Sequence, residues 1–83
     1  MKVLYFAWLR TKVGRGSEDL TPPAEVTTVA DLMDWLARDR PGFAEAMESK
    51  GVIRCAVNQA YADVDHPVRP GDEIAFFPPV TGG

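Results

Sequence analysis

The chain has 83 residues, of which 46% are hydrophobic and 25% are charged, and its formal net charge is −3. This length fits one domain over residues 1–83, and the composition is typical of a globular protein rather than a disordered one. The acidic balance argues against general nucleic-acid binding, which needs an excess of lysine and arginine.

The single cysteine, Cys55, excludes an intramolecular disulfide. Small secreted domains usually depend on disulfides, so we expect a reducing, cytoplasmic location. The apolar run at residues 3–9 is too short to span a membrane, and no cleavage site typical of a secretory signal follows it. We therefore expect a soluble protein that does not contact membranes.

The first third of the chain predicts two strands. Residues 3–9 (VLYFAWL) are continuously apolar, which favours a strand buried on both faces in the middle of a sheet. Residues 10–18 contain two glycines and predict a loop or a wide hairpin turn. Residues 20–26 (LTPPAEV) predict a second strand at a sheet edge, because its two prolines cannot donate to a ladder.

The clearest helix follows Thr28, a good N-cap, with Asp31 placed three residues later to complete the cap. Apolar side chains then recur at the i, i+3, i+4, i+7 spacing that gives a helix one apolar face. These side chains are Val29, Leu32, Met33 and Leu36. A Pro-Gly pair at residues 41–42 is predicted to end this helix, and residues 43–51 are expected to add a short helical turn.

Three further strands are predicted, at residues 52–58, around residues 61–64 and at residues 73–77, the last ended by Pro78. One amphipathic helix must then cover one face of one sheet. The predicted fold class is α+β, a β-grasp or ubiquitin-like domain. Its mixed sheet has four to five strands covered by one main helix, and its first and last strands lie side by side in the middle.

The candidates for catalysis are few. Cys55 and His66 could form a nucleophile and base pair, but Cys55 falls in the apolar pattern of a strand, where a free cysteine packs as a small hydrophobic side chain. One histidine and one cysteine are also too few for a tetrahedral zinc site. We therefore expect neither a catalytic thiol nor a bound metal.

Two other motifs have simpler explanations. The stretch VGRGSE is similar to a phosphate loop but lacks its lysine and its following helix, so we interpret it as a hairpin turn. Four acidic residues near the end could suggest a cation site, but such residues also suit turns. They are Asp63, Asp65, Asp72 and Glu73.

The chain ends in FFPPVTGG, which a frayed terminus or an expression artefact does not explain. Two prolines favour a stiff, extended arm, and the final glycines have no Cβ, so they fit a narrow channel. Such an arm would deliver its terminal carboxylate, which reacts once another enzyme has activated it. Phe76 and Phe77 point to opposite faces of the last strand, so one should fill the core and the other is a candidate partner interface.

These segments together resemble the MoaD family, the small sulfur-carrier subunits of molybdopterin synthase. GDEIAFFPPVTGG is similar to the C-terminal signature of that family. VNQAYADVDHPVRPGDE, TTVADLMDWLA and VLYFAWLRTKVG resemble its late loop, helix start and first strand, so the likeness spans nearly all of the chain.

The resemblance implies that the carboxylate of Gly83 is adenylated and converted to a thiocarboxylate. Gly82 matches the second glycine of the slim terminus. Residues 78–83 would form an extended C-terminal arm that enters the active site of a large subunit. The other arm residues are Pro78, Pro79, Val80 and Thr81.

The resemblance also implies the partners: a large MoaE-like subunit, an E1-like (MoeB-like) adenylating enzyme and a sulfur-donating sulfurtransferase. Sulfur would pass to cyclic pyranopterin monophosphate, forming molybdopterin in molybdenum cofactor biosynthesis. Two small and two large subunits would form a heterotetramer. The catalytic side chains would belong to the large subunit, so this chain is not expected to be catalytic alone. It would bind no permanent cofactor, only ATP-derived nucleotide as a transient acyl-adenylate.

Three alternatives remain open from the sequence, and the simplest is a plain binding module whose terminal glycines are incidental. Another sulfur carrier, such as that of thiamine thiazole synthesis, would share the fold and the glycine pair but not the FFPPV arm. A ubiquitin-like protein modifier would more often have a flexible polar or basic segment before its glycines.

Overall fold

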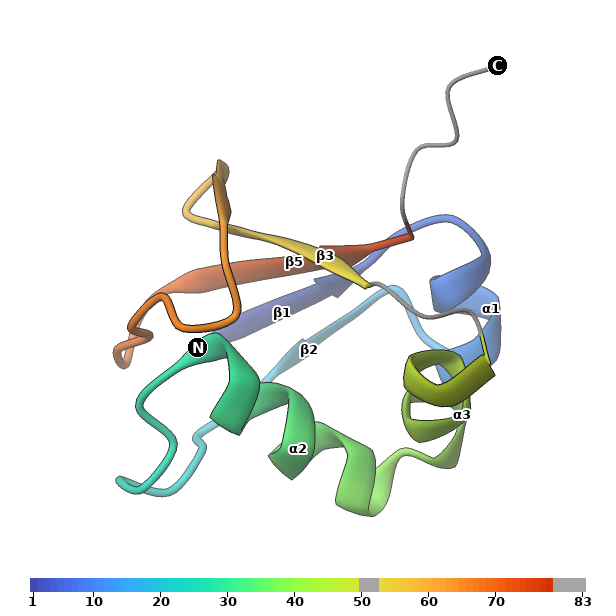
Figure 1. Ribbon diagram of the computed structural model, residues 1–83, viewed down its shortest axis with the longest axis horizontal. Coiled ribbons are helices and arrows are strands. Elements are labelled where there is room, and N and C mark those ends of the chain that lie inside the picture. The colour runs from blue at the N-terminus through green and yellow to red at the C-terminus, as the bar shows by residue number, and fades with distance from the viewer. Residues whose placement is uncertain (50–52, 79–83) are drawn as a thin grey trace.

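One mixed sheet organises the computed structural model of this chain, which describes residues 1–49 and 53–78 (Figure 1). Across the sheet the strands run in the order β2-β1-β5-β3-β4. β1 and β5 are parallel, and the other neighbouring strands are antiparallel. The first and last strands are thus side by side in the interior of the sheet, as predicted. The strands are β1 (Lys2–Tyr5), β2 (Ser17–Asp19), β3 (Arg54–Val57), β4 (Ala60–Ala62) and β5 (Glu73–Phe77).

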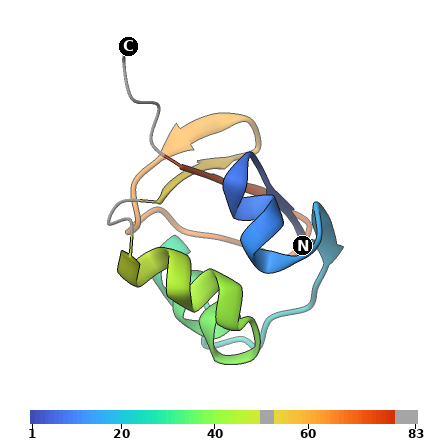
Figure 2. The ribbon, with the colours of Figure 1, turned by 90° about the vertical axis from the view of Figure 1, so that its right-hand side faces the viewer.

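The helices of the described chain lie on one side of this sheet. Figure 2 shows α2 and α3 together beneath the sheet, and α1 lies at the end of β1, in contact with α3. The α+β β-grasp prediction is confirmed. The opposite sheet face, which no described helix covers, is called the open face below. The helices are α1 (Trp8–Val13), α2 (Val29–Asp39) and α3 (Pro41–Ser49).

The core lies between the sheet and α2 and α3. All four side chains of the predicted helical stripe are buried. Three aromatic rings pack at its centre, with centroids 5.2 to 6.5 Å apart: Tyr5, Phe43 and Phe76. Each is at most 1% exposed, and burying a large apolar side chain contributes about 1.5–3 kcal/mol.

The predicted start of α2 is confirmed in detail. The Thr28 hydroxyl accepts from the Asp31 amide at 3.2 Å, and the Asp31 carboxylate accepts from the Thr28 amide at 3.3 Å. This capping box satisfies two amides that the first turn leaves free. Further hydrogen bonds from Thr27 are the main reason that the pKa of Asp31 is lowered.

The predicted strand at residues 3–9 is wrong in its second half. β1 ends at Tyr5, and the chain turns at Ala7, where φ is 56° and ψ is −139°, into α1. The side chains of the apolar run therefore lie in three different environments. Val3 and Tyr5 face the core, Leu4 faces the open side of the sheet, and Leu9 is buried from α1.

The second predicted strand is also misplaced. Residues 20–26 form a connection without a strand, whereas β2 consists of Ser17–Asp19 and pairs with β1 at the sheet edge. The hairpin turn expected at residues 10–18 is replaced by most of α1, which Gly14 ends with a φ of 94°, and by β2. Pro22 and Pro23 have no backbone N–H to donate to a ladder, so this segment is poorly suited to pair with β1.

The segment after α2 forms more helix than predicted. α2 ends at Asp39, as the Pro-Gly signal indicates, but Pro41 also suits the first position of a new helix. α3 then runs for nine residues and buries Phe43 and Ala46. Helical packing of this segment closes the end of the core beside α1.

The last three strands lie close to their predicted positions. β3 and β4 form a hairpin through Asn58 and Gln59, whose φ values of 51° and 70° fit a two-residue turn with the twist that hairpins favour. The Asn58 side chain bonds Asp72 and the Glu73 amide, which fixes the hairpin to the start of β5. β5 ends at Phe77, immediately before Pro78, as predicted.

Candidate functional site

The predicted site begins where β5 ends. Phe76 is fully buried and Phe77 is half-buried on the opposite face, which decides the question that the sequence left open. The side chain available to a partner is therefore that of Phe77, while Phe76 anchors β5 in the core. Pro78 follows directly and is half-buried. The other predicted arm residues lie outside the described part of the chain: Pro79, Val80, Thr81, Gly82 and Gly83.

Phe77 belongs to a group of three side chains on the open face, which we call the aromatic face: Phe6, Tyr61 and Phe77. The Phe6 amide donates to the Phe76 carbonyl at 3.1 Å, which continues the β1–β5 pairing and places Phe6 beside Phe77. The Tyr61 ring lies 5.7 Å from the Phe77 ring. Phe6 is 49% exposed and Tyr61 is 82% exposed, so this apolar surface is open to a partner.

Sequence reasoning did not identify Phe6 or Tyr61 as site residues. Phe6 was assigned to a strand buried on both faces, and Tyr61 to a brief extended piece. Strand alternation could have placed Phe6 opposite Tyr5, but its pairing with Phe77 depends on the parallel register.

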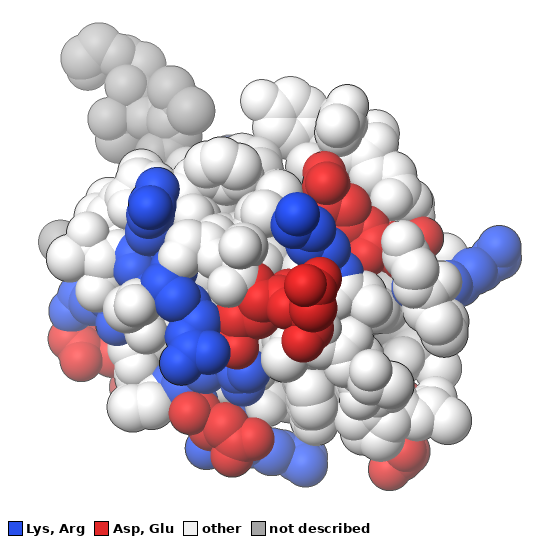
Figure 3. Space-filling view, turned by 180° about the vertical axis from the view of Figure 1, so that it is seen from behind, with Lys and Arg blue, Asp and Glu red and all other residues white. Residues whose placement is uncertain are grey.

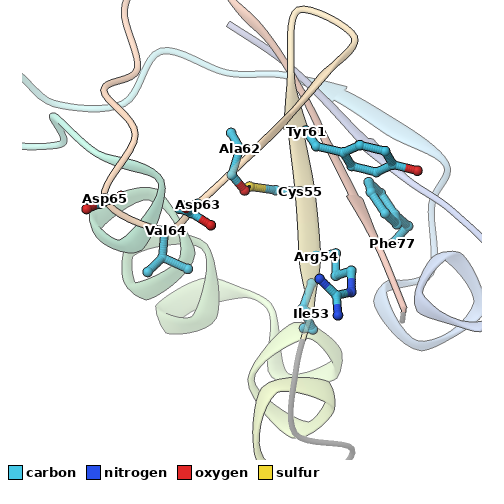
Figure 4. A pocket seen from close by; sticks show the side chains of 9 residues that line it. All are labelled: Ile53, Arg54, Cys55, Tyr61, Ala62, Asp63, Val64, Asp65 and Phe77. Atoms are coloured by element: carbon cyan, nitrogen blue, oxygen red, sulfur yellow. The ribbon is translucent and has the colours of Figure 1, made fainter. Parts of the chain in front are cut away.

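A groove of about 780 Å³ runs along β3 and the segment that follows β4 (Figure 4). Arg54, Tyr61 and Phe77 lie on one side of β3, whereas Cys55, Asp63 and Val64 lie on the other. The groove thus adjoins the aromatic face, and Arg54 places a positive charge beside it. Its lining is Ile53, Arg54, Cys55, Tyr61, Ala62, Asp63, Val64, Asp65 and Phe77.

Cys55 and His66 each contact a backbone carbonyl. The Cys55 thiol donates to the Ala62 carbonyl at 3.2 Å, and burial, with Asp63 nearby, raises the pKa of this thiol. The His66 Nδ1 lies 2.8 Å from the Pro67 carbonyl on an exposed turn. A raised pKa disfavours the thiolate, so Cys55 fits the predicted role of a buried hydrophobic side chain.

Of the four acidic residues near the end, Asp72 stabilises a turn and Glu73 begins β5. Asp72 accepts from the Arg69 amide at 2.9 Å and from the Asn58 side chain at 3.1 Å, and these bonds lower its pKa. Among the described residues, no three histidine, cysteine or acidic side chains are grouped closely enough to hold a metal ion. The turn interpretation is therefore confirmed for Asp72.

A buried ionic cluster at the other sheet edge was not predicted. Glu18 on β2 accepts from Arg40 at 2.6 and 2.7 Å, from the Tyr5 hydroxyl at 2.7 Å and from Arg15 at 3.1 Å. These bonds, above all those from Arg40, lower the pKa of Glu18, while burial and the Glu18 carboxylate raise that of Tyr5. The cluster fastens β2 to the junction between α2 and α3.

Figure 3 views the molecule from behind and shows basic side chains beside acidic ones. A band of basic side chains lies toward the side where α1 is found, and acidic side chains occupy the middle of this face. α1 itself carries Arg10 and Lys12 in its last turn, and Lys12 pairs with Glu45 of α3. The charges on this face are mixed rather than of one sign.

Within the described ranges, none of the helices combines the length and the hydropathy that a membrane crossing requires.

Comparisons with known proteins find similarity along nearly the whole chain. Residues 3–83 match the ThiS family. The chain is 43% identical over 83 residues to the molybdopterin synthase sulfur carrier subunit of Escherichia coli (strain K12), and the alignment covers 100% of this chain and 99% of that protein.

Two solved structures share the fold. One is a putative molybdopterin converting factor, subunit 1, from Pyrococcus furiosus, with a TM-score of 0.76, 31% identity and 95% of each chain covered. The other is the small archaeal modifier protein 1 of H. volcanii, with a TM-score of 0.78, 26% identity and 95% of each chain covered.

Proposed function

Because this chain belongs to the ThiS family, in its MoaD-type group of molybdopterin synthase sulfur carrier subunits, we propose that it carries sulfur on the carboxylate of Gly83. The observation that supports this most is the full-length similarity to the bacterial carrier, which includes the terminal arm. The position of β5 supports this proposal, because the strand that precedes the proposed arm lies in the interior of the sheet and is anchored in the core by Phe76.

The chemistry follows from the poor reactivity of a carboxylate. A Gly83 oxygen attacks the α-phosphate of ATP on an E1-like enzyme, giving an acyl-adenylate and releasing pyrophosphate. A persulfide on a sulfurtransferase then displaces AMP and forms an acyl disulfide. A thiol cleaves this disulfide, which leaves the thiocarboxylate on Gly83 and a disulfide formed from the thiol and the sulfurtransferase cysteine. The chain needs no catalytic side chain of its own for these steps, and the raised pKa of Cys55 supports assigning that thiol no role in them.

The thiocarboxylate then donates its sulfur to cyclic pyranopterin monophosphate inside a large subunit. Residues 78–83 form the arm that reaches this substrate, with glycine at its end because a side chain would obstruct a narrow channel. A pair of small and a pair of large subunits would form the working heterotetramer. The single cysteine supports a cytoplasmic location for this assembly.

The aromatic face is the docking surface that we assign to the large subunit. It adjoins the start of the proposed arm, and aromatic side chains that are partly exposed in the free chain are typical interface anchors. Replacing Phe77 with serine should weaken complex formation by about tenfold or more, because more than 1 kcal/mol is lost at such an anchor. Affinity for the purified large subunit measures this effect.

Val64 provides the matched control for that experiment, because it is also an exposed apolar residue, 52% exposed, but lies outside the aromatic face. Replacing Val64 with serine should leave the affinity unchanged. Equal effects of the two substitutions would refute the assignment of the docking surface.

Mass spectrometry tests the sulfur-carrier function directly. The chain is expressed with its adenylating enzyme, its sulfurtransferase and a sulfur source. We expect an oxygen-to-sulfur exchange at Gly83, dependent on ATP and absent when the adenylating enzyme is omitted. A terminus that stays a carboxylate under these conditions would contradict the proposal.

Protein modification is the second candidate, because the fold is also that of the small archaeal modifier protein 1. A modifier forms an amide between its terminal carboxylate and a lysine of another protein. The same samples distinguish the two functions: conjugates that link Gly83 to lysines of other proteins would support modification, and a free thiocarboxylate would support sulfur transfer.

A further inference from the structure

Arg54 places a cation beside the aromatic face. In the β3–β5 register Arg54 is the partner of Phe77, and its chain neighbour Cys55 is buried in the core. Because side chains alternate along a strand, Arg54 points to the open face with Phe77, as Figure 4 shows. The two side chains are direct cross-strand neighbours, separated by about 5 Å between Cα atoms.

This cation has no charged partner in the described part of the chain. The ion pairs found there join Lys12 to Glu45 and link Arg15 and Arg40 to Glu18. Asp63 directly follows β4, but it lies on the other side of β3 from Arg54 and forms no ion pair with it. Arg54 is exposed, and its guanidinium is directed to solvent beside an apolar surface.

Docking changes the environment of Arg54. A partner that covers Phe77 also removes water from its cross-strand neighbour, and a guanidinium that is buried without a counterion is strongly unfavourable. A carboxylate satisfies it best, because the planar guanidinium fork donates two parallel hydrogen bonds to one carboxylate.

We propose that Arg54 pairs with an aspartate or glutamate of the large subunit when the aromatic face docks. This inference rests on the proposed function, because it takes the large subunit as the occupant of that face. Arg54 then fixes the orientation of the docked chain and selects a partner with an acidic residue at the matching position. The aromatic side chains supply apolar contact, and the ion pair supplies specificity.

The test measures the affinity of the full-length chain for its large subunit at low and at moderate ionic strength. Arg54→Met keeps the length and apolar character of the stem but removes the charge. We expect its dissociation constant to rise about thirtyfold or more, because the carboxylate of the partner is then left without its counterion. Arg54→Lys keeps the charge but loses the fork, and it should bind with intermediate affinity.

Arg38→Met is the matched control, because Arg38 is exposed on α2, in the layer opposite the open face. It should bind like the unchanged chain, and thermal unfolding should show that both methionine variants are folded. Unchanged affinity of Arg54→Met would overturn the inference. Failure of the unchanged chain to bind the large subunit would instead contradict the proposed function.

A charge exchange identifies the partner group. Arg54→Glu should abolish binding through repulsion, and each aspartate and glutamate of the large subunit is then changed to lysine in turn. One such lysine variant should restore binding to Arg54→Glu while weakening binding to the unchanged chain. If no lysine variant restores binding, the carboxylate assignment is wrong.

Discussion

Ala7 has a backbone conformation that glycine adopts far more easily than any other residue. Its φ of 56° and ψ of −139° lie outside the regions that a Cβ permits at low cost, and it connects β1 to α1. Replacing Ala7 with glycine should stabilise the chain by about 1 kcal/mol, because relief of strain exceeds the added entropy of the unfolded chain. Urea unfolding measures this difference.

Ala24 offers the comparison, because it is exposed in a turn and has no positive φ. Ala24→Gly should lower stability by up to about 1 kcal/mol, as glycine does where alanine is unstrained. If Ala7→Gly lowers stability to the same extent, the conformation of Ala7 is not strained.

Glu18 makes stability depend on pH. The hydrogen bonds from Arg40 lower its folded pKa below the unfolded value of about 4.3, so its contribution is present above that pH and is lost as pH falls through the folded pKa. Glu18→Gln should therefore cost about 2 kcal/mol near neutral pH, and the difference from the unchanged chain should narrow below about pH 4. Denaturant unfolding across this pH range measures both effects.

Glu45→Gln controls for the removal of a surface carboxylate, since Glu45 pairs with Lys12 where both side chains are exposed. It should change stability by less than about 1 kcal/mol. A Glu18→Gln difference that stays constant down to pH 3 would show that the carboxylate charge is not responsible.

At the scale of elements, Gly42 allows α1 and α3 to pack closely. A Cβ on Gly42 would overlap the backbone carbonyl of Lys12, and no flexible side chain is available to move aside. Gly42→Ala should force the two helices apart and cost about 2–3 kcal/mol. Thermal unfolding measures the loss.

Gly14→Ala is the comparison that distinguishes the effect of the steric overlap at Gly42 from the effect of backbone strain. Gly14 has a φ of 94°, but no atom lies within 4 Å of the position that a Cβ would take. Alanine there should therefore cost about 1–2 kcal/mol through backbone conformation alone. If Gly42→Ala lowers the stability no more than Gly14→Ala does, α1 and α3 are less closely packed than described.

Elements with a local signal were predictable from the sequence. α2 has a cap, an apolar stripe and a stop signal, and β5 has an alternating run before Pro78, so both were located correctly. The end of β1 had no such signal, because Ala7 takes a backbone conformation that the sequence marks only when glycine is present. Long apolar runs also do not reveal where the chain turns.

Only the part of the site that has a local sequence signal was predictable. The arm is a local motif of residue types, whereas the aromatic face joins Tyr61 of β4, Phe77 of β5 and Phe6, which directly follows β1. The Glu18–Arg40 pair spans 22 residues and depends on β2 lying at the sheet edge, so no local pattern indicates it. Contacts that depend on strand register or on long-range packing could not be predicted from the sequence and became visible only in the structure.

For the whole molecule, the proposed carrier mechanism depends on the distance between the folded domain and the carboxylate of Gly83. Phe76 and the neighbouring strands hold β5 in place. Under the proposed function, the number of residues after Phe77 therefore sets the position at which the Gly83 carboxylate reacts in the large subunit. Removing Gly83, or adding one residue after it, should reduce sulfur transfer by about a hundredfold or more, since an ångström of misplacement costs about that much. Both variants should unfold at the temperature of the unchanged chain, because neither change touches the core.

The measurement separates activation from transfer. Thiocarboxylate formation is followed by mass spectrometry, and transfer is followed by conversion of cyclic pyranopterin monophosphate with the purified large subunit. One residue added before Met1 is the control, and it should leave both steps unchanged because it does not alter the arm. Normal conversion by the chain lengthened after Gly83 would refute the view that arm length positions the reactive atom. Normal conversion by the chain that lacks Gly83 would remove this residue as the sulfur carrier and would require the reacting group to lie elsewhere in the chain.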